Sequence, residues 1–154
     1  MQIDLAIAVA CEPAACRVRP IGGGADLDAR YGAKVKDRIK VRPGDLVAVD
    51  TESQPPKVLY RWWHGTVEAV NGDQVTVVRN VSQARPEDPR RASMTGQLGG
   101  PLLGQVQSGD TVFFGGEGHR ILDVARQGNP AHPERLREEL LPEVRLAYSG
   151  TAGA

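Results

Sequence analysis

Residues 34–50 read KVKDRIKVRPGDLVAVD, and the first nine place a cation at every even position while Val35, Ile39 and Val41 take odd ones. This alternation has the period of a strand rather than of a helix, because successive side chains of a strand point to opposite faces. The sequence therefore predicts a strand over 38–42 with its cations on one face. A Pro-Gly-Asp turn and a second strand over 46–50 should follow.

The same alternation recurs along the chain between Gly, Asn and Asp residues, which predicts an all-β protein. Asn71-Gly72-Asp73 separates two alternating segments and indicates a hairpin, because Asn-Gly tolerates the positive φ of a tight turn. Gly-Asp also precedes alternating segments at 44 and 109, which we interpret as convergent turn chemistry rather than an internal repeat. The further predicted strands are 3–9, 16–19, 26–31, 58–63, 66–70 and 74–78, with others around 112–114 and 120–124.

The second half is predicted to be a small β unit over 64–148. Within it, 82–107 is rich in Pro, Gly, Arg, Ser and Gln and has little periodicity, so a long loop is expected there. A short helix is predicted over 133–141, since Pro133 suits a first helical position and two leucines lie one turn apart on one face. Pro142 should end this helix. A frayed tail, 149–154, should follow.

The composition allows a core of ordinary size, with 40% hydrophobic residues. The 19 cations equal the 19 acids in number, which argues against a generally basic nucleic-acid coat. Residues 17–63 nevertheless carry ten Lys or Arg against six Asp or Glu, whereas 64–154 carry nine against eleven. The basic residues are therefore concentrated in the first half.

We expect a cytoplasmic protein without a membrane segment. No apolar run approaches the roughly 20 residues of a spanning helix. The run from Ile3 to Cys11 lacks a preceding cation and is interrupted by Asp4, unlike a signal peptide. Cys11 and Cys16 are too few for a disulfide framework and are expected to stay reduced.

A frame of turn glycines, apolar residues and basic residues extends over 15–62. Its members are Cys16-Arg17-Val18, Leu27-Asp28-Ala29, Gly32, Ile39-Lys40-Val41, Pro43-Gly44-Asp45, Val47-Ala48-Val49 and Leu59-Tyr60-Arg61. In this frame the chain resembles bacterial translation initiation factor one and the wider OB-fold group. The resemblance implies an OB-like small barrel over 1–63 that binds nucleic acid across its second and third strands and the flanking loops. Residues 63–154 have no counterpart in that family.

The candidate nucleic-acid-binding residues are cations, which would contact phosphates, and aromatic residues, on which bases can stack. They are Arg30, Tyr31, Lys34, Lys36, Arg38, Lys40, Arg42, Tyr60, Arg61, Trp62 and Trp63. Neighbours on a strand point to opposite faces, so one tryptophan should be buried and the other exposed, although parity does not say which. The alternative for the basic segment is a solvated edge strand whose lysines prevent pairing.

The motifs of common enzymes are absent. There is no phosphate-binding loop of the Gly-x-x-x-x-Gly-Lys type. Ser93 has no lysine after it that could form a serine–lysine dyad, because the last lysine is Lys57. Glu117 and His119 lie in a glycine-rich segment that a hairpin tip explains equally well. No His or Cys pair has zinc-ligand spacing, so no metal or cofactor is expected.

The sequence therefore predicts non-catalytic binding of RNA or single-stranded nucleic acid, in association with the ribosome or translation. The alternative is a structural or adaptor β-barrel subunit of a larger assembly. In that case the loop 82–107 and the exposed tryptophan would contact a protein partner.

Overall fold

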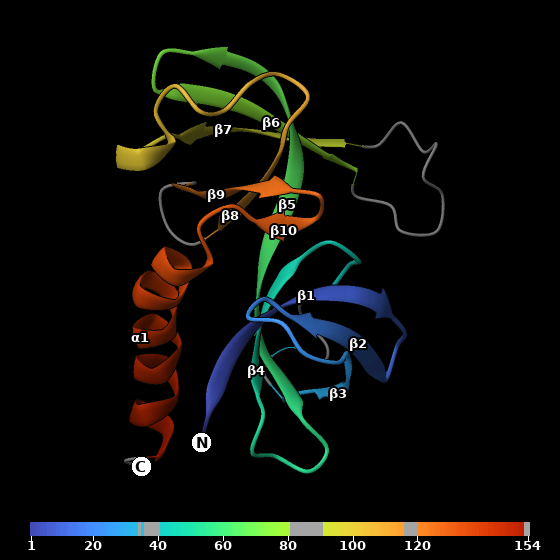
Figure 1. Cartoon of the computed structure of the whole chain (residues 1–154). Helices are drawn as coiled ribbons and strands as arrows, with labels where there is room; N and C mark the ends of the chain where they lie inside the picture. Colours follow the sequence, from blue (N-terminus) through green and yellow to red (C-terminus); the bar gives the residue numbers. More distant parts are fainter. Residues whose placement is uncertain (34, 36–40, 81–90, 116–119, 153–154) are drawn as a thin grey trace. The chain divides into compact units, whose positions relative to one another are not determined.

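A computed structural model of the chain describes residues 1–33, 35, 41–80, 91–115 and 120–152 (Figure 1). The described part is mostly β, with a mixed sheet of ten strands and one carboxyl-terminal α-helix. The elements are β1 (Ile3–Cys11), β2 (Ala15–Pro20), β3 (Leu27–Tyr31), β4 (Leu46–Asp50), β5 (Lys57–Asn71), β6 (Gln74–Asn80), β7 (Arg91–Gln97), the 3-10 helix η1 (Gly100–Leu102), β8 (Thr111–Gly115), β9 (Arg120–Arg126), β10 (Asn129–Pro130) and α1 (Pro133–Ala152).

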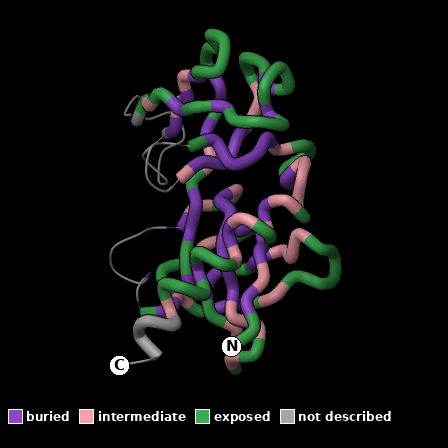
Figure 2. Tube along the Cα trace, turned by 90° about the vertical axis from the view of Figure 1, so that its left-hand side faces the viewer, coloured by how far each residue is buried: buried purple, intermediate pink, exposed green. Residues whose placement is uncertain are grey.

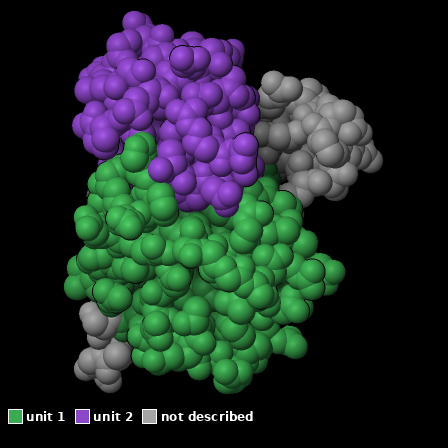
Figure 3. Space-filling view, viewed as in Figure 1, with its two compact units in different colours: residues 1–61, 132–154 green, residues 62–131 purple. Residues whose placement is uncertain are grey.

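The chain forms two compact units (Figure 3). Unit 1 comprises Met1–Arg61 and His132–Ala154, and unit 2 comprises Trp62–Ala131. The helix therefore belongs with the first half of the chain and not with the second, where the sequence pattern placed it. Its contacts explain this, because Arg137 forms a 3.3 Å ion pair with Asp4 of β1.

Five strands of unit 1 form a ring in the order β1-β2-β3-β5-β4, in which β4 pairs again with β1. The ring closes through a parallel pair, with Arg30 of β3 opposite Lys57 of β5. In β2 the buried residues Cys16 and Val18 lie on either side of the exposed Arg17, as the strand period requires. Figure 2 shows buried and exposed stretches interspersed along the trace of the chain. The residues that fill this ring are small: Ala6, Ala8, Cys16, Val18, Ala29, Val35, Val41, Val47, Val49 and Val58.

Unit 2 repeats this arrangement. Its strands form the ring β5-β6-β7-β9-β8, in which β8 pairs again with β5. If β5 is counted as the first strand of unit 2, both rings have the strand order first, second, third, fifth, fourth. The third and fifth strands again pair in parallel, with Gln97 opposite Arg120. The structure thus contains two five-stranded rings of the same connectivity, with β5 contributing its start to one and its remainder to the other.

The Gly-Asp turn before the fourth strand has the same hydrogen bonds in both rings. In unit 1 the Gly44 N–H donates to the Ala8 carbonyl at 2.8 Å, and the Ala8 N–H donates to the Asp45 carbonyl at 2.9 Å. In unit 2 the Gly109 N–H donates to the Val67 carbonyl, and the Val67 N–H donates to the Asp110 carbonyl, both at 2.8 Å.

The backbone around these turns also corresponds. The two glycines have φ values of 98° and 93°, which favour glycine over residues with a Cβ. The first strand of each ring is irregular directly after the hydrogen-bonded residue, between Ala8 and Ala10 in one and between Val67 and Ala69 in the other. The Gly-Asp pairs at 44 and 109 are therefore corners at equivalent positions of the two rings. The interpretation of these two as unrelated turns was wrong.

The two cores correspond position by position but differ in how volume is distributed. The register aligns Ala6 and Val49 of unit 1 with Gly65 and Phe114 of unit 2. A Cβ on Gly65 would lie 2.6 Å from Val77 Cγ1 and 3.2 Å from Phe114 Cε1. Glycine is therefore required at 65, because the Val77 side chain, the Val78 carbonyl at 3.0 Å and the Phe114 ring together leave no room for a Cβ.

Most of the predicted strands are confirmed. The hairpin of β5 and β6 is present, but Asn71 already pairs with Gln74, so the two turn residues are Gly72 and Asp73. Gly72 has a φ of 64°, which is the positive value expected at the first turn position of a type II′ hairpin. The segments 58–63 and 66–70 are parts of the continuous strand β5.

Two predicted elements were wrong in part. Val41 and Arg42 are not in a strand, and the rest of the predicted strand, 38–40, lies outside the described residues. Val41 is buried nonetheless, so its place in the alternating pattern reflects burial without a strand. The predicted loop 82–107 contains β7, which pairs along its whole length with β6.

The helix does not end at Pro142 but includes it and continues to Ala152, so the tail is partly helical. Proline inside a helix costs about 3 kcal/mol, because it removes one hydrogen bond and collides with the preceding turn. Buried Val144 and the Tyr148 hydroxyl, which donates to the Leu59 carbonyl at 2.9 Å, lie beyond it and offset that cost. No helix in the described part of the chain is long and apolar enough to cross a membrane.

The different distribution of side-chain volume in the two rings can be tested by substitutions at Gly65 and Phe114 of unit 2. We expect Gly65→Ala to destabilise the protein by about 1–3 kcal/mol through overpacking. Phe114→Val alone should cost about 2 kcal/mol through a cavity. The double variant restores the alanine and valine of unit 1, so its loss in urea unfolding should fall short of the sum by about 1 kcal/mol or more.

Gly99→Ala is the matched control, because a Cβ there meets nothing within 4 Å and its φ is −118°. It should leave stability nearly unchanged. Additive losses in the double variant would mean that Val77 and the Val78 carbonyl, rather than the Phe114 ring, exclude a side chain at 65.

Candidate nucleic-acid interface

The structure describes some of the predicted cations and not others. Arg30 is exposed on β3, and Arg42 is half-buried just before β4. The predicted residues Lys34, Lys36, Arg38 and Lys40 lie outside the described residues, as do Glu117 and His119.

Four cations lie on the outer side of the strands β2, β3 and β5 in unit 1. Cys16, Val18 and Ala29 are buried and point into the ring. Their neighbours along each strand must therefore point outward. These neighbours are Arg17 and Arg19 on β2 and Arg30 on β3, joined by Lys57 on β5, and we call this group the cationic face.

Three of these residues, Arg17, Arg19 and Lys57, were missed in the sequence analysis. The signal was present for two of them, because Cys16-Arg17-Val18-Arg19 alternates in the same way as 34–42. Lys57 gave no local signal, since its position beside Arg30 depends on a parallel pairing between distant strands.

Like charges meet on the cationic face. Arg30 and Lys57 are directly opposite each other at exposed positions, where like charges repel weakly unless an anion compensates them. Within the described residues neither of them forms an ion pair. Arg17 pairs with Asp28 at 3.3 Å, but both side chains are largely exposed and such a pair contributes only about 0–1 kcal/mol. A phosphate could therefore replace Asp28 at little cost.

Unit 2 has few cations at the equivalent positions. The register aligns Arg17, Arg19 and Arg30 with the neutral residues Thr76, Val78 and Gln97. Only Lys57 has a cationic counterpart, Arg120. The ring therefore does not need this concentration of charge in order to fold.

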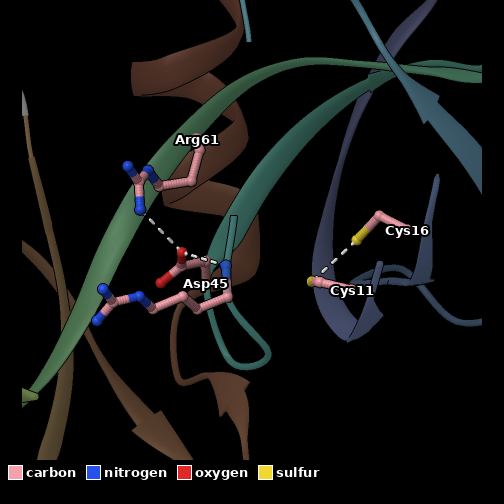
Figure 4. Close-up of polar contacts among 5 residues, drawn as sticks. Cys11, Cys16, Asp45 and Arg61 are labelled. Atoms are coloured by element: carbon pink, nitrogen blue, oxygen red, sulfur yellow. Dashed lines mark hydrogen bonds and ion pairs between the residues drawn. The ribbon is translucent and has the colours of Figure 1, made fainter. Parts of the chain in front are cut away.

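Arg61 is not available to a ligand, which corrects the prediction for this residue. Its Nη1 atom lies 3.1 Å from Asp45 Oδ2, and the side chains are 5% and 0% exposed (Figure 4). The same Asp45 oxygen accepts the Arg42 N–H at 3.0 Å. Burial lowers the pKa of the Arg61 guanidinium, and the charge of Asp45 opposes that shift. The pair stabilises the corner of the first ring.

This buried ion pair distinguishes the two corners energetically. Asp45→Ala should cost about 3–5 kcal/mol in urea unfolding, because it leaves a buried guanidinium without its carboxylate. Asp110→Ala is the matched control at the second corner, where the carboxylate accepts only the Gln107 N–H among the contacts described, at 2.9 Å. Its loss should be about 1 kcal/mol. Equal losses for both variants would contradict this assignment.

The prediction that one tryptophan is buried and the other exposed is confirmed. Trp62 is 3% exposed and Trp63 is 42% exposed. In unit 2 the Trp63 ring meets Phe114 edge-on, with centroids 5.9 Å apart, and the Arg79 guanidinium lies 4.7 Å from the ring centroid. The exposed ring is thus held by an aromatic contact and by a cation–π contact in which the guanidinium lies over one face of the ring.

The two tyrosines among the candidate residues, Tyr31 and Tyr60, both belong to unit 1 but have different environments. Tyr60 is 39% exposed, as a stacking residue must be. Tyr31 is half-buried and packs against the first core. Trp62 and Tyr31 are therefore poor stacking residues, whereas Tyr60 and Trp63 are accessible.

The two tryptophans can be separated by fluorescence. Acrylamide should quench the wild-type protein strongly through Trp63, and Trp63→Phe should lose most of this quenching because Trp62 is shielded. Trp62→Phe is the reciprocal control and should retain it. Strong quenching of Trp63→Phe in the folded state would contradict the burial of Trp62.

Among the described residues, no three His, Cys, Asp or Glu side chains are grouped so as to hold a metal ion. Comparison of the sequence with models of protein families and with curated proteins finds no match. The resemblance to translation initiation factor one therefore stays a prediction.

Proposed function

We propose that the protein binds RNA or single-stranded nucleic acid without catalysis, through the cationic face of an OB-like first ring. The observation that carries this proposal is the alignment of Arg30 with Lys57 beside Arg17 and Arg19 on one outer surface. Phosphates would relieve the repulsion within this group, and each neutralised phosphate would also release counterions.

The connectivity of the ring supports the OB-like part of the proposal. OB folds are five-stranded, partly open barrels that bind oligonucleotides over their second and third strands and over the loops after the first and fourth strands. In unit 1 the second and third strands are β2 and β3, which carry three members of the cationic face. The corresponding loops are 12–14 and 51–56.

Further residues belong to the proposal because of their charge or an exposed aromatic ring. Lys34, Lys36, Arg38, Lys40 and Arg42 precede β4 in the chain and would add phosphate contacts. Tyr60 is the exposed ring of unit 1 on which a base would stack, contributing about 1–3 kcal/mol. A link to the ribosome or translation rests on the sequence resemblance alone.

The test is fluorescence anisotropy of labelled single-stranded poly-uridine RNA with purified protein over a range of salt concentrations. We expect binding that weakens steeply with salt. Arg30→Gln/Lys57→Gln should weaken it and reduce the slope of log K against log salt by about 0.7 for each phosphate that the variant no longer neutralises. Absence of binding at low salt would overturn the proposal.

Arg126→Gln/Arg145→Gln is the matched control, because it removes the same charge from exposed positions outside the cationic face. It should leave the slope nearly unchanged. An equal effect of both double variants would mean that only the overall charge matters and that the cationic face is not a site.

The alternative is an adaptor subunit that binds another protein. It is favoured by exposed apolar residues of unit 2, namely Trp63, Val70 and Leu103. Leu103 also falls within 82–107, the segment expected to meet a partner. Light scattering that shows a concentration-dependent assembly, together with no RNA binding, would favour this alternative.

A further inference from the structure

Two cysteines face each other at the end of the first hairpin of unit 1. Cys11 ends β1, Cys16 is its partner on β2, and their Sγ atoms lie 3.3 Å apart (Figure 4). The next pair toward the turn is hydrogen-bonded, since the Glu12 N–H donates to the Ala15 carbonyl at 2.9 Å. The cysteines therefore occupy a non-hydrogen-bonded position, where Cα atoms are about 4.5 Å apart. That separation lies within the range a disulfide spans.

The fold does not require cysteines at this position. The equivalent cross-strand pair in unit 2 is Val70 and Val75, at the same step after the irregularity in the first strand. An apolar pair therefore completes the ring. The pair of thiols is thus present in unit 1 although the fold of the ring does not require it.

The two thiols differ in burial and in the direction in which their surroundings shift the pKa. Cys16 is buried, whereas Cys11 is half-buried and is the more exposed of the two residues. The Cys11 thiol as hydrogen-bond donor lowers the pKa of Cys16, and the Tyr31 hydroxyl adds to this, while burial and Asp45 act in the opposite direction. The same contact and burial raise the pKa of Cys11. The pair can thus lose one proton and share the other between two sulfurs.

We propose that Cys11 and Cys16 form a redox site at which a low-molecular-weight disulfide of the glutathione type closes a cross-strand disulfide. This inference goes beyond the proposed binding function and does not depend on it. It rests on the facing positions of the thiols, their direct contact and the partial exposure of one of them.

The reaction proceeds in two exchange steps. The pair first loses one proton to solvent, and transfer of the shared proton to Cys16 leaves the charge on Cys11. The Cys11 sulfur then attacks the external disulfide RSSR, so its S–S bond breaks and one thiolate leaves.

In the second step Cys16 loses its proton and attacks the Cys11 sulfur of the mixed disulfide. The Cys11–Cys16 bond forms and the second thiolate leaves. The protein dithiol is oxidised, RSSR is reduced, and the two protein protons end on two RSH molecules.

The test is incubation of the native wild-type protein with excess oxidised glutathione, followed by denaturation in N-ethylmaleimide and intact mass spectrometry. We expect one product that carries neither glutathione nor maleimide and has lost two hydrogens. A protein with two maleimides, a lasting glutathione adduct or a disulfide-linked dimer would each overturn the proposal.

Single variants separate the two roles. Cys16→Val should stop at a glutathione adduct on Cys11, because the second thiol is missing. Cys11→Val should remain free of glutathione, because Cys16 is buried. The reverse result would overturn the assignment of Cys11 as the attacking sulfur.

Cys11→Val/Cys16→Val reproduces the valine pair of unit 2 and is the folding control. Its melting temperature should lie close to that of the reduced wild type and should not change with oxidised glutathione. Failure to fold would show that the cysteines are needed for packing and would remove the comparison with unit 2.

Discussion

The parallel closure between the third and fifth strands is the constraint on which both rings depend. It places the fifth strand, β5 in one ring and β9 in the other, between the third and fourth strands, so all five strands of each ring are paired on both sides. Unpaired strand edges invite association with other chains, and the closure shortens these edges through two residue pairs between β3 and β5 and one between β7 and β9. The closure also requires that β5 be long, since it ends one ring and begins the next without a break.

A second consequence is that the interior of each ring has a fixed size. Unit 1 fills it with alanine, valine and Cys16, whereas unit 2 places Phe114 in it and has Gly65 beside the ring. Interiors pack as densely as organic crystals, so an added methyl group at one position must be balanced by a loss nearby. The two rings thus combine the same strand connectivity with a different distribution of side-chain volume.

The sequence predicts those elements whose signal is local. The hairpin at Gly72 and the strand 46–50 depend on turn residues and on alternation, and both are present. β7 escaped prediction because Met94 is its single large apolar residue, and its existence depends on pairing with β6. The buried Asp45–Arg61 pair and the cationic face also depend on strands that meet only in the folded chain. The sequence can single out such residues as candidates, but it does not show which residues they will contact.

The repeated ring offers a comparison within a single chain. Where equivalent positions carry the same feature, as at the two Gly-Asp corners, the feature serves the fold. Where they differ, the ring tolerates both residues, and the more costly choice needs another explanation. Arg30 opposite Lys57 repels, whereas Gln97 opposite Arg120 does not. A pair of facing thiols likewise occupies the place of two valines. Both departures lie in unit 1, so unit 1 is where binding and redox chemistry are to be sought.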